Sequence, residues 1–374
     1  MKKTLFCILL CTGLGACGGK TTTDSTEIQN TDSIAAVETI TELPPLAEGE
    51  VFLKEQDPFG EAVELKGTHI TNVDTFIFKP REPFMIMRDS VLLMRNYNAP
   101  YYAFRYPELT YIQTIGKTGD GPDEFIVPRL SPSTDSQNLA YLLEGSNGNV
   151  YGLGHDLKPV YLYNIYAGKN KGWGVDDFTN IGPDKYLYVY DSKPGKGIFQ
   201  VEMEGDSARI NEIFNLTLNK NRKSPFTYTG SMAVNTQRNR MIYAYKYFKV
   251  IKFMDMEGKS VRTLNFQQKS FDDGTLKIPN GLDANVTHYM QAIPTSDYVY
   301  ITYSGRTPYV VASENNKQNY YMYIEIYDWN GNPIKKYKLN DFSVFTAINE
   351  KTDQLVLIAY YYDDPFVVYQ LGHD

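Results

Sequence analysis

Cysteine and histidine are scarce in this chain, which has three Cys and four His among its 374 residues. So few ligands cannot assemble a disulfide framework or a cysteine and histidine metal cluster. The histidines His69, His155, His288 and His373 are scattered, with neither a His-x-His nor a His-Glu-x-x-His spacing. We therefore expect a protein without a bound metal or cofactor.

Basic residues and long hydrophobic runs are also in short supply. The 37 Lys and Arg are outnumbered by 44 Asp and Glu, which gives a formal net charge of -7. Because proteins that wrap nucleic acid present a basic face, we expect no nucleic-acid partner. Beyond residue 16 no run of about eighteen apolar residues could form a transmembrane helix. The chain is instead rich in aromatic residues, with 31 Tyr and 19 Phe, and can bury a sizeable core.

The first 16 residues have the three parts of a secretory signal peptide. Lys2 and Lys3 are followed by an apolar run from Leu5 to Leu10 and then by small residues. This run is too short to span a bilayer. Residues 1–16 are therefore predicted to be a signal peptide that is removed from the mature protein.

The end of this segment, Leu14-Gly15-Ala16-Cys17, resembles the lipobox of bacterial lipoproteins. In lipoproteins the peptidase cuts before a cysteine whose thiol already carries a diacylglycerol. The resemblance implies that Cys17 is the lipidated first residue of the mature chain and anchors it to a membrane. An ordinary signal peptide with a chance cysteine is the alternative. Gly18 stands where inner-membrane lipoproteins carry a retaining Asp, so we expect the outer membrane, facing either the periplasm or the cell surface.

A change of composition near residue 50 divides the mature chain. Residues 17–49 are rich in Thr, Ser and Glu and lack aromatic residues, which predicts a flexible linker. From residue 50 onward, short runs of Tyr, Phe, Val and Ile alternate with polar residues and are divided by Gly, Asn, Asp and Pro. This pattern is typical of β-strands. No stretch shows a capped apolar period of 3.6 residues, which disfavours an α/β fold.

Six similar units follow one another along the folded part, each with the order strand, polar turn, strand, short link, strand, turn, strand. They begin at Phe84, Leu139, Phe178, Met232, near Met290, and at Val344. Such units predict an all-β fold, a six-bladed β-propeller of four-stranded antiparallel blades in residues 50–374. Because the second unit is short and the fifth carries an insertion at residues 306–318, five or seven blades are the alternatives.

The sixth unit is one strand short, because only Gly372-His373-Asp374 follows its last apolar run. The segment Ala62–Lys66 precedes the first unit and could supply the missing strand. We expect this N-terminal strand to close the last blade. Such a closure would pair the two ends of the domain and remove exposed sheet edges.

The clearest turns of these units are Met254–Lys259 and Asp328–Asn332, in which a glycine supplies the positive φ of a hairpin. The second of them also spaces its oxygen atoms as a calcium loop does. It lacks the Gly and the Glu that such a loop requires at later positions. We therefore expect both segments to be hairpin turns.

A glycine-rich segment, Gly116 to Phe125, follows the first unit. It fails as a phosphate-binding loop because Tyr111 stands where that loop requires its first glycine, and Pro122 opposes a following helix. A structural role explains it better. The glycines permit tight turns between blades, Glu124 can accept backbone hydrogen bonds, and Phe125 can fill the core between blades.

Six irregular blades behind a lipobox, together with this segment, resemble the TolB-like six-bladed β-propeller lipoproteins of Bacteroides-type bacteria. The shared pattern is G-x-G-P-x-E-F, matched here by Gly119, Gly121, Pro122, Glu124 and Phe125. The resemblance covers nearly all of the chain beyond residue 50 and implies the fold and an address in the cell envelope. The likeness to TolB itself suggests contact with another protein.

Three pairs of adjacent carboxylates could supply the acids of a glycosidase, namely Asp176-Asp177, Asp272-Asp273 and Asp363-Asp364. Neighbours on a strand point to opposite faces of the sheet, and acids in loops are usually solvated. No G-x-S-x-G motif or catalytic cysteine is present. The pattern therefore favours a protein without catalysis.

Three tyrosine runs could form a surface that stacks on a sugar, because Tyr combines an apolar ring with a polar tip. They are Tyr101-Tyr102, Tyr320-Tyr321 and Tyr360-Tyr361-Tyr362. Packing between blades is the stronger explanation, since alternating strands must bury one face.

These features predict a lipid-anchored, non-catalytic protein of the outer membrane that binds a protein or glycan partner through one face of the ring. We expect it to be a monomer. The alternative is a glycan hydrolase or lyase with carboxylates from several blades at the central channel.

Overall fold

The computed structural model describes residues 50–52, 57–71, 80–96, 99–119, 121, 124–133, 135–165, 177–205, 207–219, 224–266, 285–359 and 361–372. The predicted signal peptide, Cys17 and the linker lie outside these residues, as do Pro122, Asp176, the pair Asp272-Asp273 and Tyr360. No helix in the described part is long and apolar enough to cross a membrane.

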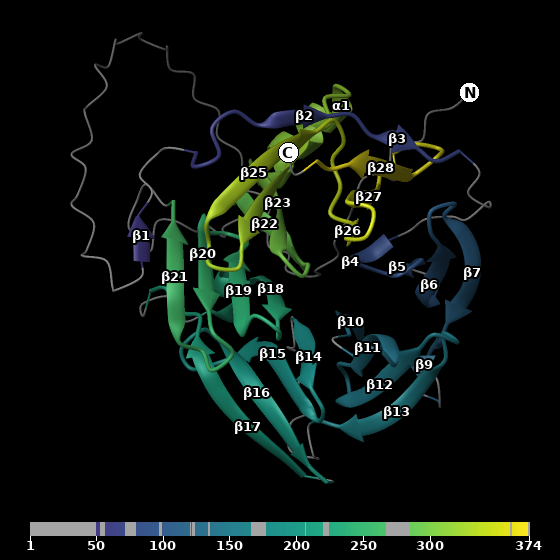
Figure 1. Ribbon diagram of the computed structural model, residues 1–374, viewed down its shortest axis with the longest axis vertical. Helices are drawn as coiled ribbons and strands as arrows, with labels where there is room; N and C mark the ends of the chain where they lie inside the picture. Colours follow the sequence, from purple (N-terminus) through teal and green to yellow (C-terminus); the bar gives the residue numbers. More distant parts are fainter. Residues whose placement is uncertain are drawn as a thin grey trace, which may run out of the picture. The chain divides into compact units, whose positions relative to one another are not determined.

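Six antiparallel sheets form the domain, and each is one blade of a propeller (Figure 1). Blade 1 contains β4 (Pro80–Arg88), β5 (Val91–Asn96), β6 (Ala99–Arg105) and β7 (Thr110–Ile115). Blade 2 contains β10 (Pro128–Pro132), β11 (Asn138–Glu144), β12 (Asn149–Gly154) and β13 (Pro159–Asn164). Blade 3 contains β14 (Phe178–Gly182), β15 (Lys185–Asp191), β16 (Lys196–Glu204) and β17 (Ser207–Asn215).

The second half of the chain repeats this plan. Blade 4 contains β18 (Gly230–Asn235), β19 (Arg240–Tyr245), β20 (Val250–Met254) and β21 (Ser260–Asn265). Blade 5 contains β22 (Thr287–Pro294), β23 (Tyr298–Arg306), β24 (Met322–Asp328) and β25 (Pro333–Leu339). Blade 6 contains β26 (Thr346–Asn349), β27 (Gln354–Ile358) and β28 (Phe366–Gln370). The predicted all-β, six-bladed propeller is confirmed.

The first strand of each blade lies innermost, and these six strands surround the centre of the ring (Figure 1). Inner strands contact one another from β4 to β10, β10 to β14, β18 to β22, β22 to β26, and β26 to β4. Between blades 3 and 4, Asp177 Oδ2 accepts a hydrogen bond from Met232 N at 2.6 Å. The ring is thereby continuous.

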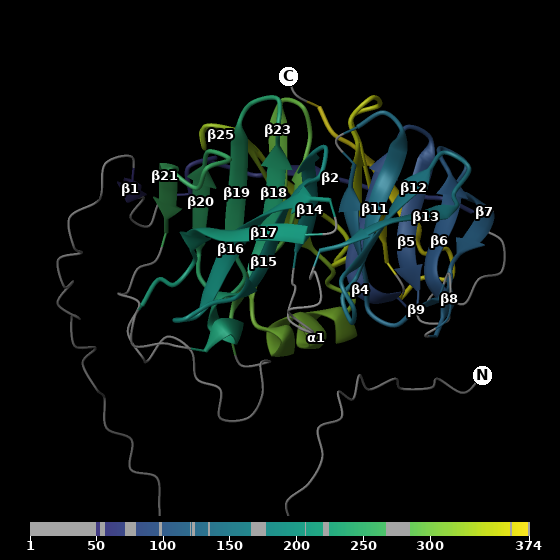
Figure 2. The same cartoon turned by 90° about the horizontal axis from the view of Figure 1, so that it is seen from below.

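Each antiparallel blade has two ends, so the ring has two faces (Figure 2). The turns from first to second strand and from third to fourth strand lie on one, here called the turn face. It comprises residues 89–90, 107–109, 133, 135–137, 155–158, 183–184, 205, 236–239, 255–259, 295–297, 329–332 and 350–353.

The links from second to third strand and the crossings to the next blade lie on the other face, here called the loop face. It comprises residues 116–119, 121, 124–127, 145–148, 192–195, 216–219, 224–229, 246–249, 285–286, 307–321, 340–345, 359 and 361–365. Its loops include the short parallel pair β8 (Lys117–Thr118) and β9 (Glu124–Phe125), the 3-10 helix η1 (Pro225–Tyr228) and the helix α1 (Pro308–Asn316).

The N-terminal segment closes the ring, as predicted, but with a later strand than the one expected. Strand β3 (Thr68–His69) pairs with β28 and is the fourth strand of blade 6. The predicted segment Ala62–Lys66 instead contains β2 (Val63–Leu65), which pairs in parallel with β25 as a fifth strand of blade 5. Alternation in sequence identifies a strand, but it does not say which sheet edge the strand joins.

Gly67 explains where the segment changes blade. A Cβ atom at this position would lie 2.2 Å from Val367 Cγ1, so only glycine lets the chain pass so close to blade 6. The Gly67 amide also donates to Asn340 Oδ1 at 3.1 Å. Upstream, β1 (Glu50–Phe52) pairs in parallel with β21 of blade 4. The segment therefore lines the outer edges of three successive blades (Figure 1).

Residues with a left-handed backbone conformation form several turns of the turn face. Four turns between first and second strands carry an Asp or Asn with φ of 52° to 55°, namely Asp89, Asp184, Asn239 and Asp353. These residue types tolerate the left-handed region because their short polar side chains form local hydrogen bonds. The sequence therefore encodes narrow turns on this face.

The two turns predicted from sequence are hairpins. Gly258 has a φ of 85° and Gly331 has a φ of 83°. Asp328 Oδ1 accepts from the amides of Asn330 and Asn332 at 2.9 and 2.8 Å. The carboxylate that a calcium loop would use is therefore occupied by its own turn.

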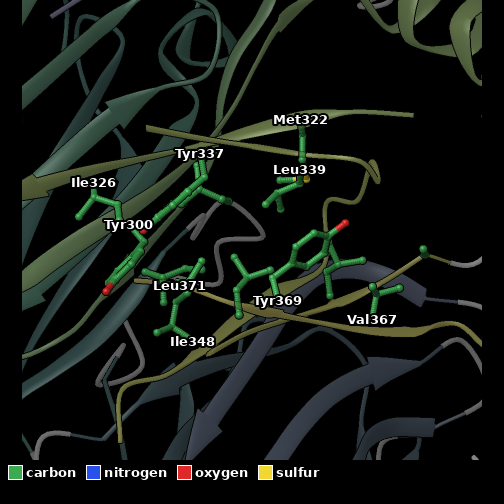
Figure 3. Close-up of a cluster of buried hydrophobic side chains, with 14 residues drawn as sticks. Tyr300, Met322, Ile326, Tyr337, Leu339, Ile348, Val367, Tyr369 and Leu371 are labelled. Carbon is green, nitrogen blue, oxygen red and sulfur yellow. The ribbon is translucent and has the colours of Figure 1, made fainter. Parts of the chain in front are cut away.

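Aromatic and aliphatic side chains fill the interfaces between blades. Between blades 5 and 6, Tyr337 and Tyr369 are buried against Ile348 and Leu371 (Figure 3). Burial of each such side chain contributes roughly 1.5–3 kcal/mol relative to exposure. The ring is held mainly by these contacts between successive blades.

The insertion expected in the fifth unit contains α1, a helix that the sequence did not reveal. Thr307 Oγ1 accepts a hydrogen bond from Val310 N at 3.2 Å and caps the helix, and Pro308 follows at its first position. The helix has nine residues and buries only Val311 among its side chains. Without an apolar stripe it leaves no periodic signal in the sequence.

Candidate functional site

A cavity of about 290 Å³ occupies the centre of the ring. Its wall is formed by residues on or beside the innermost strands of all six blades. Small-molecule sites usually enclose roughly 300–1,000 Å³, so this cavity lies just below that range. It suits a small ligand or a single side chain of a partner.

Polar residues of blades 2 to 6 line the wall. Ser231 Oγ accepts a hydrogen bond from Ala292 N at 3.1 Å. Beside it, Thr346 Oγ1 donates to Gln291 Oε1 at 2.8 Å. These bonds join neighbouring inner strands and hold the polar side chains in place, so the wall is organised before any ligand binds.

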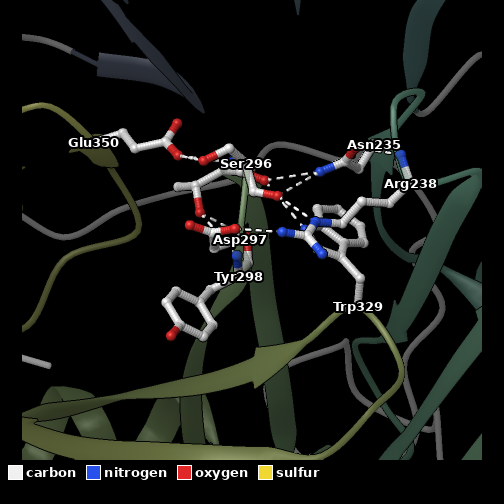
Figure 4. Close-up of polar contacts among 8 residues, drawn as sticks. Asn235, Arg238, Ser296, Asp297, Tyr298, Trp329 and Glu350 are labelled. Carbon is white, nitrogen blue, oxygen red and sulfur yellow. Dashed lines mark hydrogen bonds and ion pairs between the residues drawn. The ribbon is translucent and has the colours of Figure 1, made fainter.

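At the turn face, a network of hydrogen bonds joins three blades (Figure 4). Asn235 of blade 4 donates from Nδ2 to the carbonyls of Thr295 and Ser296 at 3.1 and 3.0 Å. From blade 6, Glu350 Oε1 accepts from Ser296 N at 2.7 Å. Trp329 Nε1 donates to Thr295 O at 3.1 Å from within blade 5. The turn after β22 is thereby fixed from three sides.

Ionic contacts continue this network around the ring. Arg238 pairs with Asp297 between blades 4 and 5. Lys351 of blade 6 pairs with Asp89 of blade 1 at 2.6 Å. Arg88 donates to two backbone carbonyls just after β10 of blade 2. The turns therefore form a linked rim from blade 4 through blades 5, 6 and 1 to blade 2.

The acids of the cavity are committed to this scaffold. Among the described carboxylates, Asp177 and Glu350 line the wall, and both accept backbone hydrogen bonds. A glycosidase at this cavity would need catalytic carboxylates other than these two. The pair Asp363-Asp364 does not line the cavity and lies on the loop face. The described residues contain no group of three His, Cys, Asp or Glu side chains placed to hold a metal ion.

The glycine-rich motif lies on the loop face, between blades 1 and 2. Gly121 N donates to Glu124 Oε2 at 2.9 Å, and Phe125 is buried in the core that joins these blades. A Cβ atom at Gly119 would lie 2.1 Å from the same carboxylate oxygen. The glycines thus make room for the Glu124 side chain, and the contacts are those of a turn that anchors Phe125.

A buried glutamate secures the end of this crossing. Glu144 accepts hydrogen bonds from Ile126 N at 2.8 Å, Val127 N at 3.0 Å and Ser146 N at 3.0 Å. Arg95 donates to the Pro128 carbonyl at 3.0 Å. Sequence reasoning did not single out Glu144 or Arg95, because nothing in a single strand shows that its charged residue turns inward.

Tyrosines from two of the predicted runs meet on the loop face, beside blade 6. The rings of Tyr320 and Tyr361 stack with centroids 4.0 Å apart, and Tyr362 lies beside both. Tyr361 donates to buried Asp341 at 3.1 Å, and burial raises its pKa. Tyr101, by contrast, is buried between blades 1 and 2. Tyr101 is therefore part of the core between blades, whereas Tyr362 is exposed at the surface.

A buried ionic cluster lies in blade 5 and holds the N-terminal segment. Lys336 contacts Glu325 at 3.1 Å and also pairs with Asp57. Burial raises the pKa of Glu325, and the two lysines Lys336 and Lys249 oppose that rise. Burial alone would lower the pKa of Lys336, but Glu325 and Asp57 raise it. The contact between Glu325 and Lys336 therefore favours the charged form of each side chain.

Exposed apolar side chains distinguish the loop face from the turn face. Phe226 of η1 is 70% exposed and Tyr309 of α1 is 63% exposed, and both belong to the loop face. Val286, Val310 and Tyr362 are further exposed residues of the same face. The described turn-face residues include none of the exposed large apolar side chains. Sequence alone could not assign these residues to one surface.

Comparisons with known proteins identify the fold. No protein-family model matches the chain, and no curated protein is found to be similar. A crystal structure of a Bacteroides fragilis protein described as exported has a TM-score of 0.54 and 14% identity, covering 86% of this chain and 98% of that one. A member of the DUF4221 family from Bacteroides vulgatus has a TM-score of 0.54 and 10% identity, covering 83% and 96%.

Proposed function

We propose that this chain is a lipid-anchored, non-catalytic protein of the outer membrane that binds a protein or glycan partner through the loop face of its propeller. The observation that carries the proposal is that Phe226, Tyr309 and Tyr362 expose aromatic rings on that face, whereas the described turn-face residues expose no large apolar side chain. An exposed apolar group surrounded by polar loops is typical of an interaction surface. Aromatic rings suit either partner, because they offer a large rigid apolar area with little loss of entropy.

The address in the envelope is supported by two independent observations. The lipobox Leu14-Gly15-Ala16-Cys17 predicts the anchor. A protein of similar fold from Bacteroides fragilis is described as exported. We also propose that the chain is related to the TolB-like lipoproteins, a relationship that implies contact with another protein.

The alternative of a glycan hydrolase gains no support from the cavity. Among the residues that the structure describes, the carboxylates that line it are Asp177 and Glu350, and both accept hydrogen bonds from backbone amides of other blades. A general acid or a nucleophile needs a carboxylate aimed at the substrate.

Crosslinking in living cells tests the proposal. A photoreactive amino acid at Tyr309 on the loop face should give a discrete adduct with an envelope protein or glycan, whereas the same group at Glu257 on the turn face should not. Replacing Phe226 by Ser should weaken the Tyr309 adduct at least fivefold. Equal adducts from both faces, or hydrolysis of envelope glycans by the purified lipoprotein, would overturn the proposal.

The anchor has a separate test. Cys17→Ala should give an uncleaved or soluble protein, and a Cys17→Ala form that is still lipidated in membranes would refute the anchor. Protease treatment of intact cells then decides the side of the membrane, because digestion places the propeller outside and protection places it in the periplasm.

A further inference from the structure

The outer edges of the six blades are treated in different ways. The outer strand of a blade presents unpaired backbone groups, which can accept another strand. In blade 4 the outer strand β21 is covered by β1, and in blade 5 the outer strand β25 is covered by β2. In blade 6 the outer strand is β3 itself. This molecule therefore already uses strand addition at its perimeter.

Blades 1 and 3 have polar outer strands. On β17, Arg209 lies within an ion-pair group with Glu202 and Glu204. The exposed residues of β7 are Thr110 and Thr114. Charged and polar side chains on an edge strand disfavour further pairing.

Blade 2 differs from all of these. Its outer strand β13 exposes three consecutive apolar residues, with Val160 at 60%, Tyr161 at 54% and Leu162 at 39%. Among the outer strands that the structure describes, no other has three such residues in a row. Strand β13 lies at the perimeter of the ring (Figure 1). Its exposed side chains project to both sides of the sheet, because neighbours in a strand alternate.

We propose that β13 is a docking edge that receives a short, extended, apolar segment of another envelope protein as a fifth strand of blade 2. The addition would repeat at blade 2 what β1 and β2 do at blades 4 and 5. Main-chain hydrogen bonds would hold the partner strand, and contacts with Val160 and Tyr161 would select apolar residues in it. This inference goes beyond binding at the loop face, since it concerns the perimeter of the ring.

The shape of β13 favours a foreign segment over a second copy of this chain. Val150 pairs with Tyr163 and Tyr151 pairs with Tyr161, so Leu162 forms a bulge in the strand. A bulge in each of two edge strands disfavours a regular ladder between them. The regular part, Pro159 to Tyr161, has three residues, which is also the length of β1 and β2. Two copies would also repel each other, because each has a net charge of -7.

The test places a photoreactive amino acid at Tyr161 in the full-length lipoprotein in living cells. The matched control is the same group at Ile334, which is 42% exposed on β25, the strand that already carries β2. We expect an adduct at Tyr161 alone, joined to an extended apolar segment of another protein. Val160→Lys should reduce it at least fivefold, whereas Ile334→Lys should leave it unchanged.

A backbone measurement completes the test. Hydrogen exchange of the complex should slow the amides of Val160 and Tyr161 relative to the free lipoprotein. An adduct with a second copy, adducts equal to those at Ile334, or an adduct unaffected by Val160→Lys would each overturn the proposal. Because the loop-face probe is at Tyr309, failure at Tyr161 is distinguishable from failure of the proposed function.

Discussion

The two faces of the ring are built on opposite principles. On the turn face, short turns bond to one another from blade to blade, as Asn235, Ser296 and Glu350 show. On the loop face, longer crossings carry α1, η1 and exposed side chains such as Phe226 and Tyr309. The turn face therefore links neighbouring blades, whereas the loop face exposes large apolar side chains.

A substitution should therefore have a different effect on each of the two faces. A change on the turn face should be measured mainly as a loss of stability, because the turns are shared between blades. A change on the loop face should leave stability nearly unchanged, because the exposed side chains contact little of their own protein.

The largest expected effect is that of Trp329→Ala on the turn face. Trp329 is buried among residues of blades 4 and 5, and its indole donates to Thr295 O. Its removal should cost about 3–5 kcal/mol of unfolding free energy, measured by urea denaturation. The control is Phe226→Ala on the loop face, which should change stability by no more than about 0.5 kcal/mol. Equal losses of unfolding free energy in the two variants would show that the two faces do not differ in this way.

A pH dependence should come from His288, beside the loop face. Burial, followed by the charge of Lys249, lowers the pKa of His288 to about 4 from its ordinary value of 6.5. The unfolded chain then binds the proton more tightly, so stability is complete above pH 6.5 and falls as the pH drops toward 4. The full effect is on the order of 3 kcal/mol.

The variant His288→Phe tests this dependence, because Phe retains an aromatic ring beside Tyr303 but takes up no proton. Urea midpoints measured from pH 7 to pH 4.5 should fall less steeply in the variant than in the natural chain. If the two slopes coincide, another group causes the acid sensitivity.

Two glycines of the turn face have positive φ, but only one of them lies close to another part of the chain. Replacing each by Ala therefore distinguishes the cost of the backbone conformation from the cost of a steric clash. At Gly258 the φ is 85°, and a Cβ atom would lie 2.2 Å from Ile213 O. At Gly205 the φ is 63°, but no atom lies within 4 Å of such a Cβ. Gly205→Ala should cost about 1–2 kcal/mol from the left-handed conformation alone, and Gly258→Ala should cost more. Thermal unfolding that ranks them in the reverse order would contradict this account.

The smallest expected effect is that of Lys351→Ala. Its ion pair with Asp89 is exposed, and such pairs contribute less than about 1 kcal/mol. The loss should diminish further in high salt, measured by urea denaturation at two salt concentrations. A larger loss would mean that the linked rim acts cooperatively.

The fold could be predicted because its signals are local. Alternating strand patterns and turn glycines such as Gly258 and Gly331 identify hairpins locally. Six repeats of a pair of hairpins then define the ring. The second unit begins at Pro128, earlier than the expected Leu139, because its first strand is short and contains two prolines. Helix α1 was missed because its signal lies in the cap Thr307 and not in a periodic pattern.

The candidate site could be predicted only in part, because its residues are assembled from distant units. The motif residues Gly121, Glu124 and Phe125 were found from their spacing; Glu124 accepts a hydrogen bond from Gly121 N, and Phe125 is buried. The cavity residues Ser231 and Gln291 carry no local signal, since any polar residue on an inner strand looks the same in sequence. Exposure of Val160 and Tyr161 depends likewise on which edges β1 and β2 cover.

The pairing of β3 with β28 has a consequence for the order of folding. Contacts across this closure, such as that between His69 and Asp364, join positions 295 residues apart. Contacts of such separation form slowly, because a long loop must close before they contribute. The strand that is synthesised first must therefore wait for the last one, and an incomplete chain exposes an open blade that chaperones and proteases can recognise.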